Sequence, residues 1–386
     1  MAKSYQFLKA SAEKARDNVH RRKILKAITT YESKVNERKQ LQFRDWSRAR
    51  QQAAQVKDYV LAHLPDLLET FEKNISSRGA KVLWAEDSEE ARKHFESIVR
   101  THGSQKIVKA KSMATEEIEL NDMLQGLGLE VSETDLGEMI VQLAGEKPYH
   151  IITPAMHKSR QDIAELFHEK LGTPKDAEAE TLTAAAREYL RQSFVTADLG
   201  VSGANFLVAD EGAVVQVENE GNARLTMACP PVLVVLVGIE KVLPRFEDLG
   251  LFLPLLATSG TGQAVTCYNN ILRGPKRPEE LDGPEHLYVI LLDNGRSRLY
   301  DDAQFRVSLR CIRCGACINS CPVYRTIGGH TYGTTYQGPI GSVITPHLRD
   351  LGQWQHLAYA SSLCGACSNV CPVEIEIHRL LLENRV

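Results

Sequence analysis

The sequence of 386 residues has no apolar run long enough to cross a bilayer. Its longest apolar stretches, residues 230–239 and 249–257, fall well short of the roughly 20 residues that a transmembrane helix needs. The N-terminus also lacks the apolar core of a secretory signal peptide. These absences predict a cytoplasmic protein without a transmembrane segment, in a compartment where thiols stay reduced.

An excess of one charge sign is missing as well, since 46 Lys and Arg face 49 Asp and Glu. This balance excludes the whole-protein field that draws a chain to nucleic acid or to an anionic membrane, so no nucleic-acid partner is predicted. A G-x-G-x-x-G motif that opens a helix after a strand is also absent. The sequence therefore gives no support for a nicotinamide or flavin site of that type.

The first segment, residues 1–75, is polar and carries apolar residues at helical spacing, such as Leu64 and Leu68. It predicts a helical N-terminal arm, which Pro65 kinks or splits. The basic cluster at residues 21–23 indicates a solvated helix face, or a surface that docks on an acidic partner or on the rest of the chain.

The second segment, residues 76–303, alternates short apolar runs with helical patterns. This repetition predicts an α/β domain with a mainly parallel central sheet, because buried parallel strands read as continuous apolar runs. The expected strands lie in residues 81–85, 106–111, 150–156, 204–210, 212–219, 231–239 and 285–300, and the expected helices in residues 89–103 and 116–128.

The third segment, residues 304–386, holds seven of the nine cysteines in two groups. The first group is C-x2-C-x2-C-x3-C-P, in which the last cysteine ligates a different cluster from the first three. On this template one [4Fe-4S] cluster is bound by Cys311, Cys314, Cys317 and Cys371, and three corners of a second are bound by Cys321, Cys364 and Cys367. Two neighbouring clusters of this kind are suited to passing single electrons.

Zinc is the alternative for C-x2-C pairs, but a tetrahedral zinc ion needs four ligands and has no use for the shared cysteine before proline. The small residues Gly315, Ala316, Gly365 and Ala366 favour iron-sulfur, because they let the backbone approach a cluster and point N–H groups at its sulfurs.

The second motif has only three cysteines, because Ser361 stands where the template expects the first. The second cluster is then a [4Fe-4S] cluster with an open or non-cysteine corner, a [3Fe-4S] cluster, or a cluster completed by Cys229, Cys267 or a partner. An open iron suggests substrate binding, whereas an electron relay tolerates three thiolates. Cys229 and Cys267 have apolar neighbours in the sequence, which predicts buried and inert thiols.

About forty residues separate the two motifs, more than a compact bacterial ferredoxin needs, which favours a helical two-cluster ferredoxin module. His330, Tyr332 and Tyr336 lie in this insertion. Each is a candidate to line a path to a cluster, with packing and hydrogen bonding as the alternative role.

Polar residues follow several expected strands, where open sheets bind ligands. The candidate catalytic residues are Glu133, Asp135 and Arg224. Arg224 suits a bidentate clamp on a carboxylate, whereas Asp135 also suits a helix N-cap. Further candidates are Thr134, Asp210, Glu211, Glu218, Glu220, Asn222 and TSGTGQ at 258–263, which predicts a loop whose N–H groups face an anion. His150 and His157 flank an expected strand, and packing roles are predicted for both.

A family resemblance rests on SETDLGEMIVQL (132–143), HIITPAMHKSR (150–160), residues 196–225, DGPEHLYVILLDNGRSRLY (282–300) and the cysteine regions at 309–346 and 359–375. These phrases cover most of residues 105–386. The chain resembles the lactate utilization protein B family, the iron-sulfur component of a three-part L-lactate utilization system.

The resemblance implies an α/β domain similar in fold to the NagB/RpiA/CoA-transferase group, followed by a helical two-cluster ferredoxin module. It implies A and C components as partners in oxidising L-lactate to pyruvate, and a second motif with three cysteines throughout the family. Members continue for several tens of residues beyond that motif, whereas this sequence stops at HRLLLENRV, so a C-terminal truncation is expected.

The sequence and the resemblance favour an electron-transfer subunit that passes electrons from L-lactate to an acceptor. The alternative is a self-contained iron-sulfur enzyme that acts on a small hydroxyacid at the incompletely ligated cluster near Ser361. A third possibility is a scaffold or redox sensor without enzymatic activity.

Overall fold

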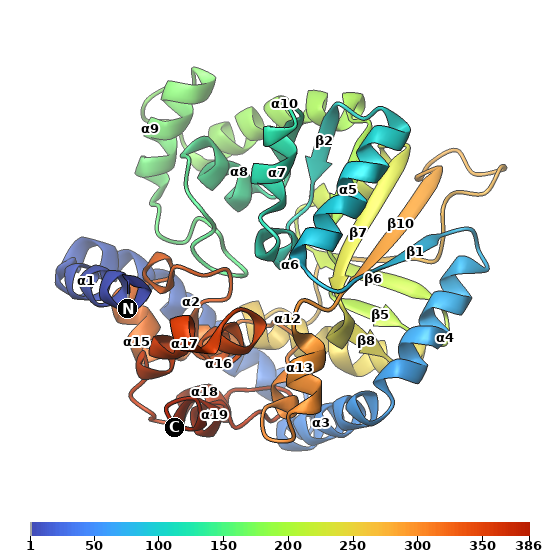
Figure 1. The fold of residues 1–386 in the computed structure, drawn as a ribbon. Helices are drawn as coiled ribbons and strands as arrows, with labels where there is room; N and C mark the ends of the chain where they lie inside the picture. Colours follow the sequence, from blue (N-terminus) through green and yellow to red (C-terminus); the bar gives the residue numbers. More distant parts are fainter. Residues whose placement is uncertain (1) are drawn as a thin grey trace.

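The computed structural model describes residues 2–386, and its centre is a six-stranded sheet in which every neighbouring pair is parallel (Figure 1). The sheet confirms the predicted mainly parallel α/β architecture. In spatial order its strands are β1 (Lys81–Ala85), β10 (His286–Leu292), β7 (Val232–Gly238), β4 (Leu199–Ser202), β2 (Lys106–Lys109) and β3 (Glu130–Glu133).

A second, four-stranded sheet lies beside the first and was not separated from it by the sequence pattern. Its strands in spatial order are β8 (Val242–Leu243), β5 (Phe206–Val208), β6 (Ala213–Glu218) and β9 (Tyr268–Leu272). Strands β5 and β6 form an antiparallel hairpin. The runs at 204–210 and 212–219 therefore form strands as predicted, but in this smaller sheet.

Residues 150–156 form no strand, so that prediction was wrong. The segment instead folds on itself, with Tyr149 N–H donating to the Pro154 carbonyl at 2.9 Å and Ile152 N–H donating to His150 Nδ1 at 3.0 Å. Its apolar side chains Ile151 and Met156 are buried by packing beside the cysteine module. An apolar run of this length does not distinguish a strand from a buried irregular segment.

Side chains of the central strands alternate between two cores, as the pleat requires. Val234 packs with Phe95 of α5 (Ser88–His102) on one face. Val235 packs with Phe71 of α4 (Leu64–Ser76) on the other. Because α4 covers the sheet, the last helix of the predicted arm contributes to the α/β core, and the arm boundary at residue 75 stays a prediction.

The N-terminal arm contains α1 (Ala2–Arg16), α2 (Asn18–Gln42), α3 (Trp46–Ala62) and α4, and Pro65 in the first turn of α4 marks the predicted split. The arm packs against the rest of the chain: Arg310 of the cysteine module pairs with Asp58 of α3, and Lys23 of α2 pairs with Asp162. The basic cluster therefore docks in part on the chain itself. Figure 1 shows the blue N-terminal helices beside the orange and red C-terminal module.

The predicted helix at 116–128 is interrupted at Glu119, whose φ is 52°. The remaining helical elements of the α/β region are α6 (Met113–Glu117), α7 (Leu120–Gly126), α8 (Leu136–Leu143), α9 (Arg160–Leu171), α10 (Ala179–Thr196), α11 (Asn222–Ala228), η1 (Ile239–Lys241), η2 (Phe246–Asp248) and α12 (Leu249–Thr261).

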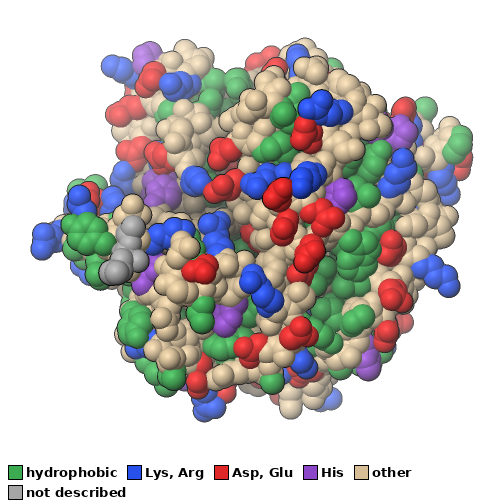
Figure 2. All heavy atoms as spheres, in the orientation of Figure 1, with side chains coloured by type: hydrophobic (Ala, Val, Ile, Leu, Met, Phe, Trp, Pro, Cys, Tyr) green, Lys and Arg blue, Asp and Glu red, His purple; other side chains and the backbone are tan. Residues whose placement is uncertain are grey.

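The C-terminal module is built of short helices, as predicted. It follows α13 (Arg296–Asp301), and its elements are η3 (Arg306–Arg310), α14 (Ala316–Asn319), α15 (Pro322–Ile327), η4 (His330–Tyr332), α16 (Gly338–Leu348), α17 (Leu351–Trp354), η5 (Gln355–Tyr359), α18 (Ala366–Asn369) and α19 (Ile377–Glu383). No helix in residues 2–386 is long and apolar enough to cross a membrane. Figure 2 shows basic and acidic side chains mixed over the displayed face, consistent with the balanced composition.

A buried ionic network joins the sheet to the cysteine module. Arg296, which is 1% exposed, lies with its Nη2 2.8 Å from Glu117 Oε2 and its Nε 2.6 Å from Glu240 Oε2. From the cysteine module, Tyr336 Oη donates to Glu117 Oε2 at 2.6 Å and Arg313 Nη2 lies 3.2 Å from Glu240 Oε1. The network fixes the position of the module relative to the carboxyl ends of the strands.

Candidate functional site

The two cysteine motifs fold into the same backbone shape. In the first motif the two neighbours of Cys314, Arg313 (φ 59°) and Gly315 (φ 77°), have left-handed backbone conformations. In the second motif the two neighbours of Cys364, Leu363 (φ 54°) and Gly365 (φ 80°), have the same conformations. A one-turn helix, α14 or α18, follows each glycine. This repeat aims backbone N–H groups at the sulfurs, because successive left-handed and helical residues form a concave array of donors.

Backbone donors contact the thiols directly. Arg313 N–H donates to Cys311 Sγ, Tyr324 N–H to Cys321 Sγ and Ile375 N–H to Cys371 Sγ, each at 3.4 Å. Such bonds favour a negatively charged sulfur. They are what a ligand of an iron-sulfur cluster requires.

The thiols form two groups in space. Burial, and then the negative charges of Cys371 and Cys311, raise the pKa of Cys314. Burial, and then Cys311 and Cys314, raise the pKa of Cys317. The Cys371 thiol, at least fifty residues away in the sequence, therefore lies near Cys311 and Cys314, and its place in the first cluster stays a prediction.

The second group contains the three remaining thiols. Burial raises the pKa of Cys367 to about 11, with contributions from Cys321 and Cys364. The negative charge of Cys367 also raises the pKa of Cys317. Cys317 of the first group and Cys367 of the second group are therefore neighbours. Because burial disfavours isolated thiolates, the buried sulfurs of Cys321 and Cys367 need the positive charge of bound iron to ionise.

The spacing of the thiols tests the zinc alternative. Sulfurs around a tetrahedral zinc ion lie about 3.8 Å apart, given a Zn–S distance of about 2.3 Å. Among residues 2–386, no three of these cysteine sulfurs lie within 4.8 Å of one another. This spacing is wider than the spacing of sulfurs around a tetrahedral zinc ion. Cys229 and Cys267, predicted to be buried, are both exposed, because they lie at the surface ends of α11 and β9, and neither belongs to the two groups.

Ser361 occupies the position equivalent to Cys311. Its Oγ accepts the N–H of Leu363 at 3.1 Å, as Cys311 Sγ accepts the N–H of Arg313. The nearby Cys364 is exposed, and N–H donation from Ala366, followed by Ser362, lowers its pKa. The second group is therefore closer to solvent than the first.

Ser361→Cys is expected to increase the iron retained after mild oxidation, because thiolate is the ligand that iron-sulfur clusters prefer. Iron and sulfide analysis with electron paramagnetic resonance (EPR) before and after oxidation measures this change. Ser362→Cys, which adds a thiol one residue away, is the control and is expected to leave iron retention unchanged. Equal retention in wild type and Ser361→Cys would show that Ser361 does not face the cluster.

A central cavity of about 360 Å³ lies at the carboxyl ends of the parallel strands. Lys111, Gly203 and Lys241, which follow β2, β4 and β7, line one side, and Arg313 and Cys314 of the cysteine module line another. Open parallel sheets bind ligands at this edge. A small molecule in this cavity therefore borders a cysteine of the first group.

Cationic donors face this cavity. Arg313 Nη1 is buried without a hydrogen-bond partner. Lys241 is half-buried, and burial followed by the charge of Arg313 lowers its pKa to about 8. Lys111 Nζ donates to the Ile152 carbonyl. An unpaired guanidinium nitrogen and a nearby ammonium are the donors that a carboxylate requires. The sequence analysis did not identify Arg313 and Lys241 as candidate site residues. Their positions, directly before a cysteine of the first motif and shortly after the strand β7, could have indicated them.

Acidic residues also line the central cavity. Asp135 borders the cavity and caps α8, accepting the N–H of Glu138 at 3.0 Å, so its predicted N-cap role is confirmed and its catalytic role stays a prediction. Glu220 accepts the N–H of Leu136 at 3.0 Å. Desolvation, followed by the charge of Asp135, raises the pKa of Glu220 to about 7, although much of the residue is exposed. Glu220 can therefore exchange a proton near neutral pH.

The other predicted residues lie elsewhere. Glu133 is 3% exposed and lies 2.8 Å from Lys109 Nζ in a buried ion pair, so its position is outside the central cavity. Arg224 is exposed on α11 and lines neither cavity. The expected TSGTGQ loop begins inside α12, where Thr258 is buried, so its first N–H groups bond within the helix. Of the further candidates for binding a ligand, three line the central cavity, namely Glu218, Glu220 and Asn222. The other three, Thr134, Asp210 and Glu211, do not line it.

The predicted histidines and tyrosines also have defined surroundings. His150 is buried and lies 3.2 Å from Asn319 Oδ1, a packing role as predicted. Tyr336 lines the central cavity. Tyr332 is buried near Cys321 and Cys317, and its pKa is raised mainly by burial and also by the negative charges of these two cysteines. A second, acidic cavity of about 380 Å³ is lined by His330 and by Glu116, Glu119, Asp122, Glu133, Glu138 and Glu146.

Comparison with known proteins matches two segments of the chain. Residues 68–292 match the LUD domain, and residues 307–375 match the 4Fe-4S dicluster domain. The second match supports iron-sulfur clusters as the group that the cysteine module holds. Lactate utilization protein B of Bacillus pumilus is 44% identical over 88% of this chain and 72% of its own length.

A second relative has the same name as the first. Lactate utilization protein B of Macrococcus caseolyticus is 42% identical over 93% of this chain and 76% of its own length. A DUF162 family protein from Deinococcus radiodurans, known from a crystal structure, covers 59% of this chain and 98% of its own at 12% identity and a TM-score of 0.34, too weak a likeness to define a shared fold.

Proposed function

This chain belongs to the lactate utilization protein B family, and from that premise we propose that it is the electron-transfer component of a system that oxidises L-lactate to pyruvate. The observation that carries the proposal is the serial arrangement of the thiols. Cys314 of the first group borders the central cavity, Cys317 neighbours Cys367 of the second group, and Cys364 of the second group is exposed.

Iron-sulfur clusters held by these two groups would supply one-electron transfer. The first set of ligands is Cys311, Cys314, Cys317 and Cys371, and the second is Cys321, Cys364 and Cys367 with Ser361 at the fourth corner. The protein's part is to bury Cys314, Cys317 and Cys371 of the first group beside the cavity, and to leave Cys364 of the second group accessible to an electron acceptor. Donors to the sulfurs hold both groups in place.

The central cavity is the proposed site for the small acid. Arg313 Nη1 and Lys241 would bind its carboxylate, and Glu220, with a pKa near 7, would accept the hydroxyl proton. Oxidation of the alcohol to a ketone would release two protons and two electrons: the hydroxyl proton would go to Glu220, the proton from Cα would go to water, and the electrons would pass one at a time to the acceptor. Binding energy from two cationic donors would hold the acid against the first cysteine group.

The partners in this proposal are A and C components, as the family name and the three-part system imply. The proposal also includes the type of fold of the α/β domain and the boundaries of the three segments. They are a NagB/RpiA-like α/β domain at 76–303, a helical arm at 1–75 and a two-cluster module at 304–386.

The alternative, a self-contained enzyme that acts at the corner near Ser361, receives less support. Cys314 lines the central cavity, and no member of the second cysteine group does. Substrate in that cavity would therefore contact the group with four thiols. The exposed position of Cys364 suits exchange of electrons with a partner protein instead.

The anaerobically reconstituted chain alone is expected to oxidise L-lactate only marginally with an artificial acceptor, and adding the A and C components is expected to restore turnover. In the restored system Lys241→Gln is expected to raise KM for lactate about tenfold, since a carboxylate loses one charged partner worth about 1.4 kcal/mol. Steady-state kinetics with L-lactate as the varied substrate measures both effects.

Arg277→Gln is the control, because Arg277 is an exposed arginine outside the cavity, and its KM should equal that of wild type. Full turnover by the single chain would refute the division of labour. An unchanged KM in Lys241→Gln would place the acid outside this cavity while leaving the electron-transfer role intact.

A further inference from the structure

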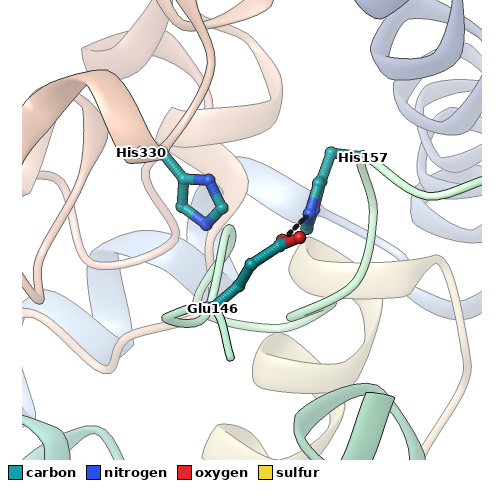
Figure 3. Close-up of side chains that lie close together, drawn as sticks. All are labelled: Glu146, His157 and His330. Atoms are coloured by element: carbon teal, nitrogen blue, oxygen red, sulfur yellow. Dashed lines mark hydrogen bonds and ion pairs between the residues drawn. The ribbon is translucent and has the colours of Figure 1, made fainter. Parts of the chain in front are cut away.

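A second cluster of ligand-bearing side chains lies away from the cysteines. One ring nitrogen each of His157 and His330 and a carboxylate oxygen of Glu146 all lie within 4.8 Å of one another. Figure 3 shows the three side chains pointing toward a common point, Glu146 and His157 from one loop region and His330 from the cysteine module. Two imidazoles and one carboxylate are the donor set that many iron and zinc proteins use.

The carboxylate is oriented by a residue outside the group of three. Lys158 Nζ lies 2.6 Å from Glu146 Oε1, which keeps that oxygen occupied. The other oxygen, Oε2, lies 2.6 Å from His157 Nε2. A metal ion bound by both atoms would replace this hydrogen bond.

The two imidazole rings are also held in place. His157 is 13% exposed at its side chain and stacks on Tyr149, with ring centroids 4.6 Å apart and 22° between the planes. Its Nδ1 is buried without a hydrogen-bond partner. His330 lies 4.9 Å from His157, measured between ring centroids, and its Nε2 contacts the Lys147 carbonyl oxygen at 2.7 Å. Rings that are fixed in this way pay little entropy to bind a metal.

The sequence GGH at 328–330 is required for this arrangement. Gly328 has φ 73°, and a Cβ there would collide with Tyr149 Oη; a Cβ on Gly329 would collide with the Tyr149 carbonyl oxygen. Only glycines let His330 approach the loop that carries Glu146 and His157. The close approach brings together groups from segments almost two hundred residues apart.

Glu146 and His330 line the acidic cavity as well, so solvent and small molecules have access to these two side chains. The acidic wall, which includes Glu116, Glu119 and Asp122, attracts cations to this cavity. A site with three protein ligands and access to a cavity retains positions for water or another ligand.

We propose that Glu146, His157 and His330 bind a divalent first-row transition metal ion, such as Mn²⁺, Fe²⁺ or Zn²⁺, at the edge of the acidic cavity. This site is separate from both cysteine groups and does not depend on the proposed function. It adds a mononuclear metal to a chain whose other metal ligands are thiolates. Tyr149 and Tyr324, whose ring centroids are 6.2 Å apart, link it to Cys321, whose Sγ accepts the N–H of Tyr324.

The test uses Mn²⁺ as the probe, because it prefers oxygen and nitrogen ligands over thiolates and leaves the cysteine groups alone. Mn²⁺ is titrated into the reconstituted protein with intact clusters at room temperature, and free Mn²⁺ is followed by its EPR signal. Binding of one Mn²⁺ per chain is expected. Glu146→Gln, which keeps the size of the side chain, and His330→Gln are each expected to weaken binding about tenfold or more.

Glu119→Gln is the matched control, because Glu119 lines the same cavity but is not one of the three ligands, and it is expected to change affinity by less than about threefold. Iron content must match wild type in every variant, which shows that the fold is intact. Absence of saturable one-to-one binding overturns the proposal. Equal weakening by Glu119→Gln and Glu146→Gln also overturns it, since that result indicates diffuse attraction by the acidic wall.

Discussion

Cys371→Ala is expected to remove about half of the iron, leaving about four of the roughly eight irons per chain that two [4Fe-4S] clusters hold. Although Cys371 belongs to the second sequence motif, its thiol lies with Cys311 and Cys314 of the first. The variant should therefore share its spectrum with Cys311→Ala, and the double variant should lose no more iron than either single one. Iron and sulfide analysis with EPR of the reduced protein measures this outcome.

The matching pair for the other group is Cys321→Ala and Cys364→Ala, which should share a different residual spectrum. Cys229→Ala is the control, because this exposed thiol lies outside both groups, and it should retain all the iron. If Cys371→Ala resembled Cys364→Ala instead of Cys311→Ala, each motif would hold its own cluster, and the proposed division of ligands would be wrong.

Arg296→Met is expected to destabilise the protein by about 3–5 kcal/mol, because it leaves the buried Glu117 without its cation and Glu240 with Arg313 alone. Glu117 and Glu240 are 7% and 1% exposed, and both contact Arg296 within 3 Å. The loss should also loosen the cysteine module, since Arg313 and Tyr336 bond to the same two carboxylates. Anaerobic thermal unfolding followed by circular dichroism measures the decrease in melting temperature.

The matched control is Arg100→Met, which removes an exposed arginine paired with Glu96 on α5. Exposed pairs of this type contribute about 0.3–0.5 kcal/mol, so the melting temperature should scarcely move. Arg296→Lys should give an intermediate result, because an ammonium cannot form the paired contacts of the guanidinium. Equal melting temperatures for Arg296→Met and Arg100→Met would mean that the buried network contributes nothing to stability.

Local patterns in the sequence predicted much of the fold. The run KVLWA forms β1 with the predicted bounds, and the apolar run after residue 230 forms the fully buried β7. These assignments succeed because strand period and apolar continuity are properties of a few neighbouring residues. The run at 150–156 failed for the opposite reason, since its burial comes from the cysteine module, where Ile152 packs close to Gly315.

The residues of the candidate site were also predicted only in part from the sequence. Cysteine spacing predicted which thiols lie together, and the division of the thiols between two clusters stays a prediction, with Cys371 near Cys314 and with Cys321 and Cys364 near Cys367. The predicted burial of Cys229 and Cys267 was wrong, because apolar neighbours in sequence do not determine which side chain faces solvent. Arg224 was a candidate for clamping a carboxylate, yet Arg313 and Lys241 are the donors that line the cavity.

The sequence by itself determined the parallel sheet and the iron-sulfur character of the module, because strand patterning and cysteine spacing are encoded over short distances. Only the tertiary structure decided that the cavity lies against Cys314 and that Glu146 and His157 meet His330. Those contacts join segments separated by more than a hundred residues. They depend on how the sheet, the arm and the module pack together, which no local pattern records.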